Sequence, residues 1–340
     1  MFKDKTLIGI DIGSNTIKMV EIEHKKDLKE LVTYGVARHD IDLEGYWDAT
    51  KLRQLSRIIG DIIKSGKFTG IRTMIGAMSK HVFVTTMDFE ASWDKKTIQA
   101  EIEKQSKYFL PYPPDEMRLS WSVIEGDPRI ISYTGKQRII INALPDFVLE
   151  NNRNLLEHIN LDGIGLENQI ISQTRAVLSG DLGNTILVDV GADQFTLSII
   201  VDGVLRSTSF VETGGNKITE DLSYSLGVDF ITAENFKKDL GLINLMTLPK
   251  PLFDTLAVIK TELNNFIEIN RKISQTPNKV VFTGGGIHLA GFTEFFKNFP
   301  IPVFIADPTK GIFIDPDYRP YITPISNQLS TAIGLALKEG

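Results

Sequence analysis

The chain has 340 residues, of which 42% are hydrophobic and 24% are charged, and its formal net charge at pH 7 is −6. This length favours two or more lobes of an ordinary soluble globular protein, and the acidic balance argues against nucleic-acid binding. Cysteine is absent and no apolar run is long enough to cross a bilayer, which excludes a disulfide framework and a helical membrane span.

The first part of the chain alternates between strand and helix patterns. Strands are expected over 7–12, 17–22 and about 31–37. A helix over 50–65 follows, with apolar residues at helical spacing, and then a strand over 71–76. This order predicts the beginning of an α/β lobe.

Residues 82–160 interrupt the pattern with a block of its own. The expected strand, helix, two strands and second helix cover 82–88, 94–109, 118–125, 138–144 and 145–159. A proline-rich segment, Leu110-Pro-Tyr-Pro-Pro114, ends the first of these helices. A block of this size predicts a small subdomain inserted into the first lobe.

The remaining chain predicts an interlobe helix over 167–179 and a second lobe that begins at Thr185. A hairpin over 196–210 turns at Asp202-Gly203, a strong two-residue turn signal. Later helices are expected over 216–226, 232–239, 252–275, 288–298 and 326–338, with a strand over 279–283.

We therefore divide the chain into five consecutive parts. They are a first lobe, an inserted subdomain, an interlobe helix region of the first lobe, a second lobe with nucleotide-binding subdomains, and a C-terminal helix that returns to the first lobe. Their boundaries are 1–81, 82–160, 161–182, 183–322 and 323–340.

Two short stretches, one in each lobe, share a plan. In each, an apolar strand ends in an aspartate, Asp11 or Asp189, and a glycine two positions later, Gly13 or Gly191, opens a tight turn into a second strand. Glycine lets the backbone approach a ligand closely, and the N–H groups of such a turn can point at a phosphate. Two such hairpins indicate two related halves that face one nucleotide.

The side chains of these hairpins suit a nucleotide and its metal ion. Asp11 and Asp189 could hold a hydrated Mg²⁺ between the phosphate turns, although each could instead cap its own turn. Lys18 could bind phosphate as a point charge or be a solvated strand residue. The further phosphate candidates are Ser14, Asn15 and Thr16 of the first hairpin and Asp193 and Thr196 of the second.

Three further places carry candidate residues. Gly284-Gly285-Gly286 lies between a strand and a helix, where bare backbone could receive a base or ribose. Gly214-Gly215 forms a glycine loop before a helix, a plausible approach point for ribose or phosphate. Glu234, Lys237 and Lys238 lie one helical turn apart and could bracket ribose and adenine, or form ordinary surface ion pairs.

Glu167 opens the expected interlobe helix. A carboxylate there could orient a water for attack on the γ-phosphate, whereas an acidic residue at a helix N-terminus needs no catalytic role. Asp189 would contribute to catalysis through the metal ion that it holds.

The order of these motifs resembles the actin-like ATPase superfamily, an α/β fold of two ribonuclease H-like lobes. The place of the inserted block narrows the resemblance to the FtsA and PilM branch. The segments 100–116, 210–219 and 233–238, which include Tyr-Phe-Leu-Pro-Tyr-Pro and Ala-Glu-Asn-Phe-Lys-Lys, are similar to the PilM family, cytoplasmic actin-like proteins of type IV pilus assembly. The membrane-targeting tail of FtsA is missing, which favours PilM.

This resemblance implies ATP and Mg²⁺ between the lobes and a place at the inner membrane through a partner. The partner would be the cytoplasmic N-terminal tail of a PilN-like membrane protein, lying in a groove between the first lobe and the inserted subdomain, alongside other pilus platform proteins. Glu167 matches the superfamily's water-positioning residue. Gln194-Phe195 departs from the hydroxyl residues common in the family, and a bulky Phe195 beside the phosphates could weaken hydrolysis or rearrange the loop.

Three functions follow as hypotheses. The leading one is a nucleotide-dependent scaffold with slow or incidental ATP hydrolysis. The alternative is a filament-forming protein like FtsA or MreB, for which a homo-oligomer is expected. A kinase or phosphatase on the same fold would need a second substrate cleft with a positioned base, and the sequence offers no such constellation.

Overall fold

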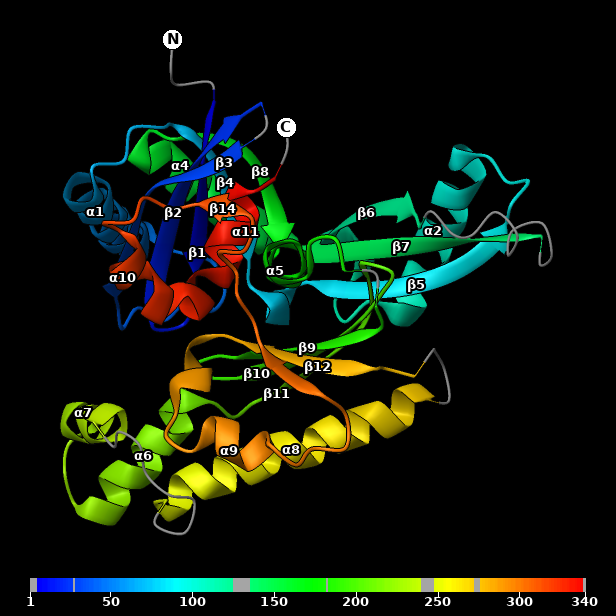
Figure 1. Ribbon diagram of the computed structural model, residues 1–340. Coiled ribbons are helices and arrows are strands. Elements are labelled where there is room, and N and C mark those ends of the chain that lie inside the picture. The colour runs from blue at the N-terminus through cyan, green and yellow to red at the C-terminus, as the bar shows by residue number, and fades with distance from the viewer. Residues whose placement is uncertain are drawn as a thin grey trace.

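The computed structural model describes residues 5–26, 28–124, 135–181, 183–239, 248–271 and 276–338. Three β-sheets organise these residues into a first lobe, an insert that projects from it, and a second lobe below (Figure 1). The two-lobed architecture with one inserted block is the arrangement expected from the sequence.

The first lobe is built on a mixed six-stranded sheet in the order β14-β3-β2-β1-β4-β8. Its strands are β1 (Thr6–Ile12), β2 (Thr16–Lys25), β3 (Leu28–Arg38), β4 (Arg72–Ala77), β8 (Asp162–Asn168) and β14 (Ile312–Phe313). The four strands expected from the sequence are confirmed. The alternation rule missed β8 and β14, because β8 carries two glycines and three exposed residues and β14 is only two residues long.

Two pairs of helices cover this sheet. One face, with Ile8 and Ile10 of β1, packs on α1 (Ala49–Gly66) and α4 (Asp146–Ile159). The other face packs on α5 (Gln169–Leu178) and α11 (Ser330–Ala336). The N-terminus of α1 is fixed by Asp48, whose carboxylate accepts the N–H groups of the second and third residues after it, both at 2.8 Å.

The position of α4 corrects the predicted boundary of the insert at residue 160. Leu155 of α4 is fully buried among the strands and α1 of the first lobe. The insert therefore ends where β7 ends, and α4 belongs to the first lobe. The helix itself was predicted correctly, but its apolar face does not reveal which core it joins.

The insert is a three-stranded sheet in the order β5-β7-β6 with one helix on it. Its elements are β5 (Phe83–Glu90), α2 (Lys95–Phe109), β6 (Met117–Val123) and β7 (Lys136–Pro145), with 3₁₀ turns η1 (Ser79–His81) and η2 (Pro114–Glu116). The predicted loop between β6 and β7 lies outside the described residues, as does Glu125. The face opposite α2, with Ile140, packs against Leu205 of the second lobe.

The second lobe is built on a five-stranded sheet in the order β11-β10-β9-β12-β13. Its elements are β9 (Thr185–Val190), β10 (Phe195–Val201), β11 (Val204–Val211), α6 (Gly215–Leu226), α7 (Phe230–Asp239), α8 (Lys250–Arg271), β12 (Lys279–Thr283), η4 (Gly285–His288), α9 (Phe292–Phe296) and β13 (Val303–Ile305). The turn at Asp202-Gly203 is confirmed, because both residues have positive φ angles, 53° and 75°. The predicted end of the helix over 252–275 lies outside the described residues.

The chain returns to the first lobe earlier than the predicted boundary at residue 322. Ile312 of β14 pairs in parallel with Lys29 of β3 and packs with Val20. α10 (Arg319–Ile322) and η5 (Thr323–Leu329) then lead into α11. Among the described residues, no helix combines the length and apolarity that crossing a bilayer requires.

Candidate functional site

The two predicted hairpins are confirmed and have the same construction. The N–H of Gly13 donates to the carbonyl of Thr16 at 3.0 Å, and the N–H of Gly191 donates to the carbonyl of Gln194 at 3.0 Å. Each aspartate lies on the first strand of its hairpin, opposite Lys18 in one and Thr196 in the other. The backbone of the two turns therefore has the same hydrogen-bonded conformation in both lobes.

Helix α5 connects the two hairpin carboxylates. Gln169 donates to Asp11 Oδ1 at 2.7 Å, and Gln173, one turn later, donates to Asp189 Oδ2 at 2.8 Å. Residues four apart lie on one face of a helix, so a single rigid element contacts both aspartates. The sequence reasoning missed both glutamines; their four-residue spacing directly after a strand is the signal that could have found them.

The environment of Asp11 is that of a paired carboxylate. Asp11 is 4% exposed, and Lys18 Nζ lies 2.9 Å from its Oδ2. Lys18 therefore points toward Asp11 and not to solvent, so it is not the solvated strand residue of the second alternative. With donors on both oxygens, the protein itself compensates the charge of Asp11.

Asp189 differs from Asp11 although its hairpin is the same. It is partly exposed, and among the described residues no Lys, Arg or His lies within ion-pair distance of it. Desolvation by the surrounding protein raises the pKa of Asp189; the hydrogen bond from Gln173 and the charge of Lys18 oppose this rise, and the nearby charge of Asp11 adds to it. A carboxylate with such neighbours is one that a bound cation would stabilise.

The donor set around Asp11 and Asp189 fits Mg²⁺. Magnesium prefers oxygen ligands and uses one or two carboxylates together with water and phosphate. No group of three or more His, Asp or Glu side chains in the described part of the chain could hold a metal ion alone. The remaining ligands of a cation here would therefore come from water and from the ligand itself.

The triple-glycine loop wraps around the end of β9. A Cβ on Gly284, which has a φ of 89°, would lie 2.3 Å from Asp189 Oδ1, and one on Gly286 would lie 2.2 Å from Val190 Cγ1. Two of the three glycines thus allow close packing against β9. Gly285 is exposed, and a Cβ on it would lie no closer than 3.5 Å to its nearest neighbour, Gln328. Gly285 is therefore the glycine whose backbone is accessible.

The glycines before α6 serve the second hairpin. A Cβ on Gly214 would lie 2.5 Å from the carbonyl oxygen of Ala192, so only glycine fits. The N–H groups of Gly215 and Asn216 donate to the carbonyls of Gly191 and Ala192, at 3.1 and 2.8 Å. This helix N-terminus holds the turn in place.

The charged residues of α7 form ion pairs. Glu234 lies 2.6 Å from Lys237 Nζ and 3.0 Å from Lys238 Nζ. Lys237 is 9% exposed and also donates to Thr219 Oγ1 of α6 at 2.7 Å. The ion pairs of the alternative are therefore present, but Lys237 is buried and its contact with Thr219 joins α6 to α7, which was not predicted. Arg38 of the first lobe reaches the same Glu234 at 3.5 Å.

A pair of amides bridges the lobes beside the two turns. Asn15 Nδ2 donates to Asn216 Oδ1 at 2.7 Å, and Asn216 Nδ2 donates back to Asn15 Oδ1 at 3.0 Å. Asn216 also donates to Asp193 Oδ1 at 2.6 Å. Asn15 and Asp193 are thus brought together as predicted, whereas Asn216 was not among the predicted residues.

His39 is a second residue that sequence reasoning missed. Its Nδ1 lies 3.2 Å from the N–H of Ile41 and accepts it, which leaves Nε2 protonated to donate to the carbonyl of Gly13 at 2.8 Å. Its own N–H donates to the carbonyl of Asn15 at 3.0 Å. Burial lowers the pKa of His39, and the neutral ring fixes the turn of the first hairpin.

Glu167 does not open the interlobe helix, and this expectation was wrong. It lies on β8, and α5 begins at Gln169 after the N-cap residue Asn168. Both carboxylate oxygens bind Arg175 at 2.8 Å, and Lys338 Nζ lies 2.7 Å from Oε1. These contacts tie β8 and α5 to the end of the chain, and they argue against the predicted role in orienting a water.

Phe195 directly follows the second turn in the chain, but its side chain does not face the space between the lobes. It is fully buried in the core of the second lobe, so the expected steric effect on hydrolysis has no basis in its position. Neighbouring residues of a strand point to opposite faces, and Thr196 accordingly points away from this core. The roles of Ser14, Thr16 and Thr196 at a ligand stay predictions.

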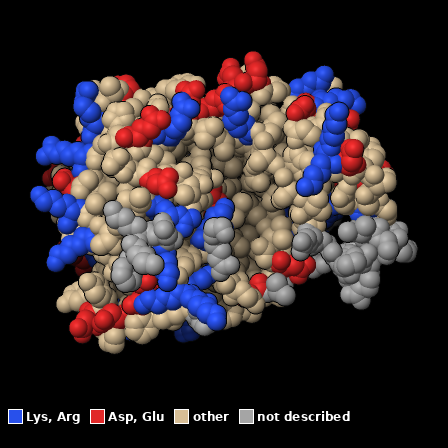
Figure 2. Space-filling model, turned by 90° about the horizontal axis from the view of Figure 1, so that it is seen from above, with Lys and Arg blue, Asp and Glu red and all other residues tan. Residues whose placement is uncertain are grey.

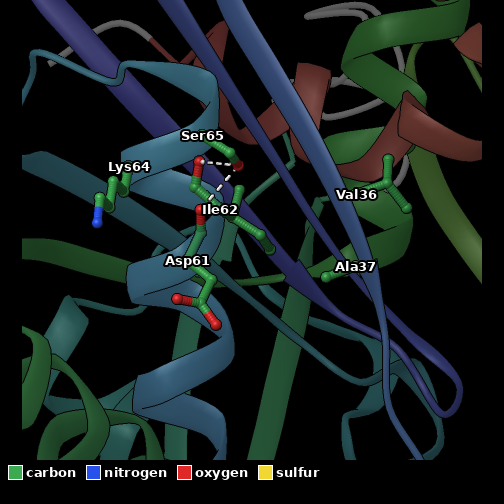
Figure 3. A pocket seen from close by; sticks show the side chains of 6 residues that line it. All are labelled: Val36, Ala37, Asp61, Ile62, Lys64 and Ser65. Atoms are coloured by element: carbon green, nitrogen blue, oxygen red, sulfur yellow. Dashed lines mark hydrogen bonds between the residues drawn. The ribbon is translucent and has the colours of Figure 1, made fainter.

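The described surface of the protein includes two hollows, and neither is lined by the hairpin aspartates. One lies at the outer edge of the first-lobe sheet, between Val36 of β3 and Ile62 of α1, where the hydroxyl of Ser65 binds helix carbonyls (Figure 3). None of its lining residues is a candidate site residue. The other is small and lies at the root of the insert, lined by Ile12, Trp47, His81 and Phe147 among others.

A family model described as type IV pilus assembly protein PilM matches residues 9–340. Cell division protein FtsA of Enterococcus faecalis is 25% identical over 269 residues, which cover 71% of this chain and 59% of that protein. The chain thus spans less than two thirds of the length of this relative.

Solved structures show the fold. A structure of the PilM-PilN type IV pilus biogenesis complex superimposes with a TM-score of 0.83 at 16% identity, covering 97% of both chains. MreB 5 of Spiroplasma citri bound to AMPPNP gives a TM-score of 0.52 at 11% identity, covering 97% of this chain and 94% of that one. The predicted actin-like fold is confirmed.

Proposed function

The chain belongs to the family of type IV pilus assembly protein PilM, and from this premise we propose that it binds ATP with Mg²⁺ between its lobes and, in that state, presents a docking surface to a PilN-like inner-membrane protein. The observation that carries the nucleotide proposal is the pair of identical hairpin turns whose aspartates are both held by one face of α5.

The candidate residues divide the work of binding. The backbone N–H groups of the turns at Gly13 and Gly191 would face the phosphates, and Lys18 would add a positive charge. Asp11 and Asp189 would hold the metal ion, which supplies neutralisation of the phosphate charge. Exposed Gly285 would face the sugar or base.

Binding, more than turnover, is the function that the site supports. Glu167 is paired with Arg175 and Lys338. The side-chain amide of Gln169 donates to Asp11 at 2.7 Å and accepts the N–H of Ser79 at 3.1 Å. Among the described residues, we identify no other carboxylate as a candidate for activating a water molecule. We therefore expect ATP hydrolysis to be slow.

The insert supports the partner proposal. Viewed from above, a hollow lined by uncharged residues lies between the first lobe on the left and the insert on the right, with charged residues scattered along its rim (Figure 2). The insert also packs on the second lobe through Ile140 and Leu205. A nucleotide that moves the lobes would therefore move the insert and alter this hollow, where a partner's tail would lie.

Isothermal titration with Mg-ATP tests the nucleotide proposal. Wild type is expected to bind and Gly284→Val is expected not to, because the valine would meet Asp189. Absence of binding to wild type would overturn the proposal. Titration with the cytoplasmic N-terminal peptide of a PilN-like protein, with and without Mg-ATP, tests the partner; equal affinity in both conditions would contradict nucleotide control.

A further inference from the structure

Gln173 lies where four elements of the two lobes meet. Its side chain comes from α5, contacts Asp189 at the end of β9, and reaches Thr331 of α11. The loop after β12 closes the other side of Asp189, because Gly284 lies against Asp189 Oδ1. Gln173 and Thr331 are each only 3% exposed, so both of these side chains are buried where the contacts form.

The geometry fixes the direction of the Gln173 amide. Nε2 donates to Asp189 Oδ2 at 2.8 Å and to Thr331 Oγ1 at 3.0 Å, so both of its N–H bonds are used. The flipped amide would turn its carbonyl oxygen toward the Asp189 carboxylate and lose that bond. Asp189 thus selects the orientation in which Gln173 donates, and Thr331, whose hydroxyl can accept or donate, holds the amide in place from the other side.

We propose that Gln173 is a positioning residue, which holds the Asp189 carboxylate in the direction that a nucleotide-bound cation requires, and that Thr331 of the C-terminal helix anchors the Gln173 side chain for this task. This inference rests on the proposed function. It adds that the second hairpin depends on α11, a first-lobe element, for the aim of its carboxylate.

The contrast with the first hairpin supports this role. Asp11 has Lys18 and Gln169 as donors and keeps one if the other is lost. Asp189 has Gln173 as its one side-chain donor within the described residues. A residue that orients a metal ligand through a hydrogen bond typically affects metal affinity by about 10- to 100-fold, so the effect of Gln173 should be measurable.

The test is calorimetric titration of ATP into the full chain, once with Mg²⁺ and once with EDTA. Wild type is expected to bind more tightly with Mg²⁺. Gln173→Leu, which keeps the volume and removes the donor, is expected to lose about tenfold of that magnesium-dependent gain while its affinity in EDTA stays unchanged. Thr331→Val should show a smaller loss in the same direction.

Thr174→Val is the matched control on the same helix. The hydroxyl of Thr174 donates only to the carbonyl of Ile170, at 2.7 Å, and the residue is 9% exposed. This variant should behave as wild type. Should Gln173→Leu fail to fold, Thr331→Val carries the test, because its substitution is isosteric.

Each outcome decides the matter. An unchanged magnesium gain in Gln173→Leu, or an equal loss with and without Mg²⁺, would overturn the positioning role and leave the proposed function standing. No binding of ATP to wild type would overturn the proposed function and this role with it. Loss confined to the magnesium-dependent part supports both.

Discussion

The two hairpins share one construction and differ in the surroundings of their aspartates. Asp11 is 4% exposed and paired with Lys18, so its charge is compensated within the first lobe. Asp189 is partly exposed and has an amide as its side-chain partner, without a cation within ion-pair distance among the described residues. A repeated motif therefore need not be a repeated environment: a lysine compensates the charge of the aspartate in the first hairpin, whereas in the second hairpin the aspartate has only an amide as its side-chain partner among the described residues.

Substitutions of the glycines that lie beside the two aspartates should give the largest contrast. Gly284→Val places side-chain atoms against Asp189 and forces a positive φ on a β-branched residue, so the free energy of unfolding should fall by about 3 kcal/mol or more. Gly13→Ala should cost about 1 kcal/mol or less, since its Cβ would meet the flexible end of Lys18 at 3.1 Å. Urea denaturation of both variants measures the difference, and equal losses would contradict it.

Removing each charge should change stability in opposite directions. Asp11→Asn leaves Lys18, whose side chain is 16% exposed, without its partner, and should lower the free energy of unfolding by about 1 kcal/mol. Asp189→Asn removes a poorly compensated charge while Gln173 keeps an oxygen acceptor, and should raise it by about 1 kcal/mol. Chemical denaturation without nucleotide checks both signs. A loss of stability in both variants would break the proposed contrast.

Glu167 provides a third carboxylate with which to sharpen the comparison. Burial raises the pKa of Glu167, but the ion pairs with Arg175 and Lys338 outweigh burial and hold the pKa below its ordinary value of 4.5. Because the folded pKa is lowered, the stabilisation is present above pH 4.5 and is lost as the pH falls through the folded pKa. Glu167→Gln should lower the free energy of unfolding by about 1 kcal/mol at pH 7, a value discounted for the exposure of the partners of Glu167. The substitution should have no effect at a pH where Glu167 is protonated in both the folded and the unfolded state.

That expectation is checked by denaturation of wild type and Glu167→Gln between pH 7 and pH 3. The gap between the two curves should close at the acid end. A gap that is independent of pH would mean that the ion pairs do not stabilise the fold.

The smallest expected effect concerns the contact between the hairpins. The reciprocal amide pair of Asn15 and Asn216 joins the lobes in the free protein. A double-mutant cycle with alanine at both positions should give a coupling of about 0.5 kcal/mol, because each hydrogen bond replaces one to water. Zero coupling would show that the lobes are not held together by this pair.

Much of the fold could be predicted from local patterns in the sequence. The hairpin strands, α1, α2 and the turn at Asp202-Gly203 all follow from alternation, helical spacing and turn chemistry, and the structure has them near the predicted residues. The pattern failed at β8, where Gly163 and Gly165 interrupt the alternation; a Cβ on Gly163 would lie 2.4 Å from Leu156 Cδ1, so packing and not strand propensity selects this residue.

Long-range contacts account for what the sequence could not predict at the site. Asp11 and Asp189 could be placed on matching hairpins from their spacing to glycine alone. The pairing of Gln173 with Asp189 and Thr331, and of Glu167 with Arg175 and Lys338, depends on how α5 and α11 cross, which no local pattern specifies. The same holds for α4, whose periodic apolar face would suit either the insert or the first lobe.

The most direct test of the account is titration of Mg²⁺ into ATP-saturated wild type and Asp189→Asn, followed by calorimetry or thermal melting. The account predicts that Mg²⁺ tightens ATP binding and raises the melting temperature of wild type, and that Asp189→Asn binds ATP but gains little from Mg²⁺. An equal gain in both proteins, or none in wild type, would contradict the claim that the second hairpin is completed by a cation.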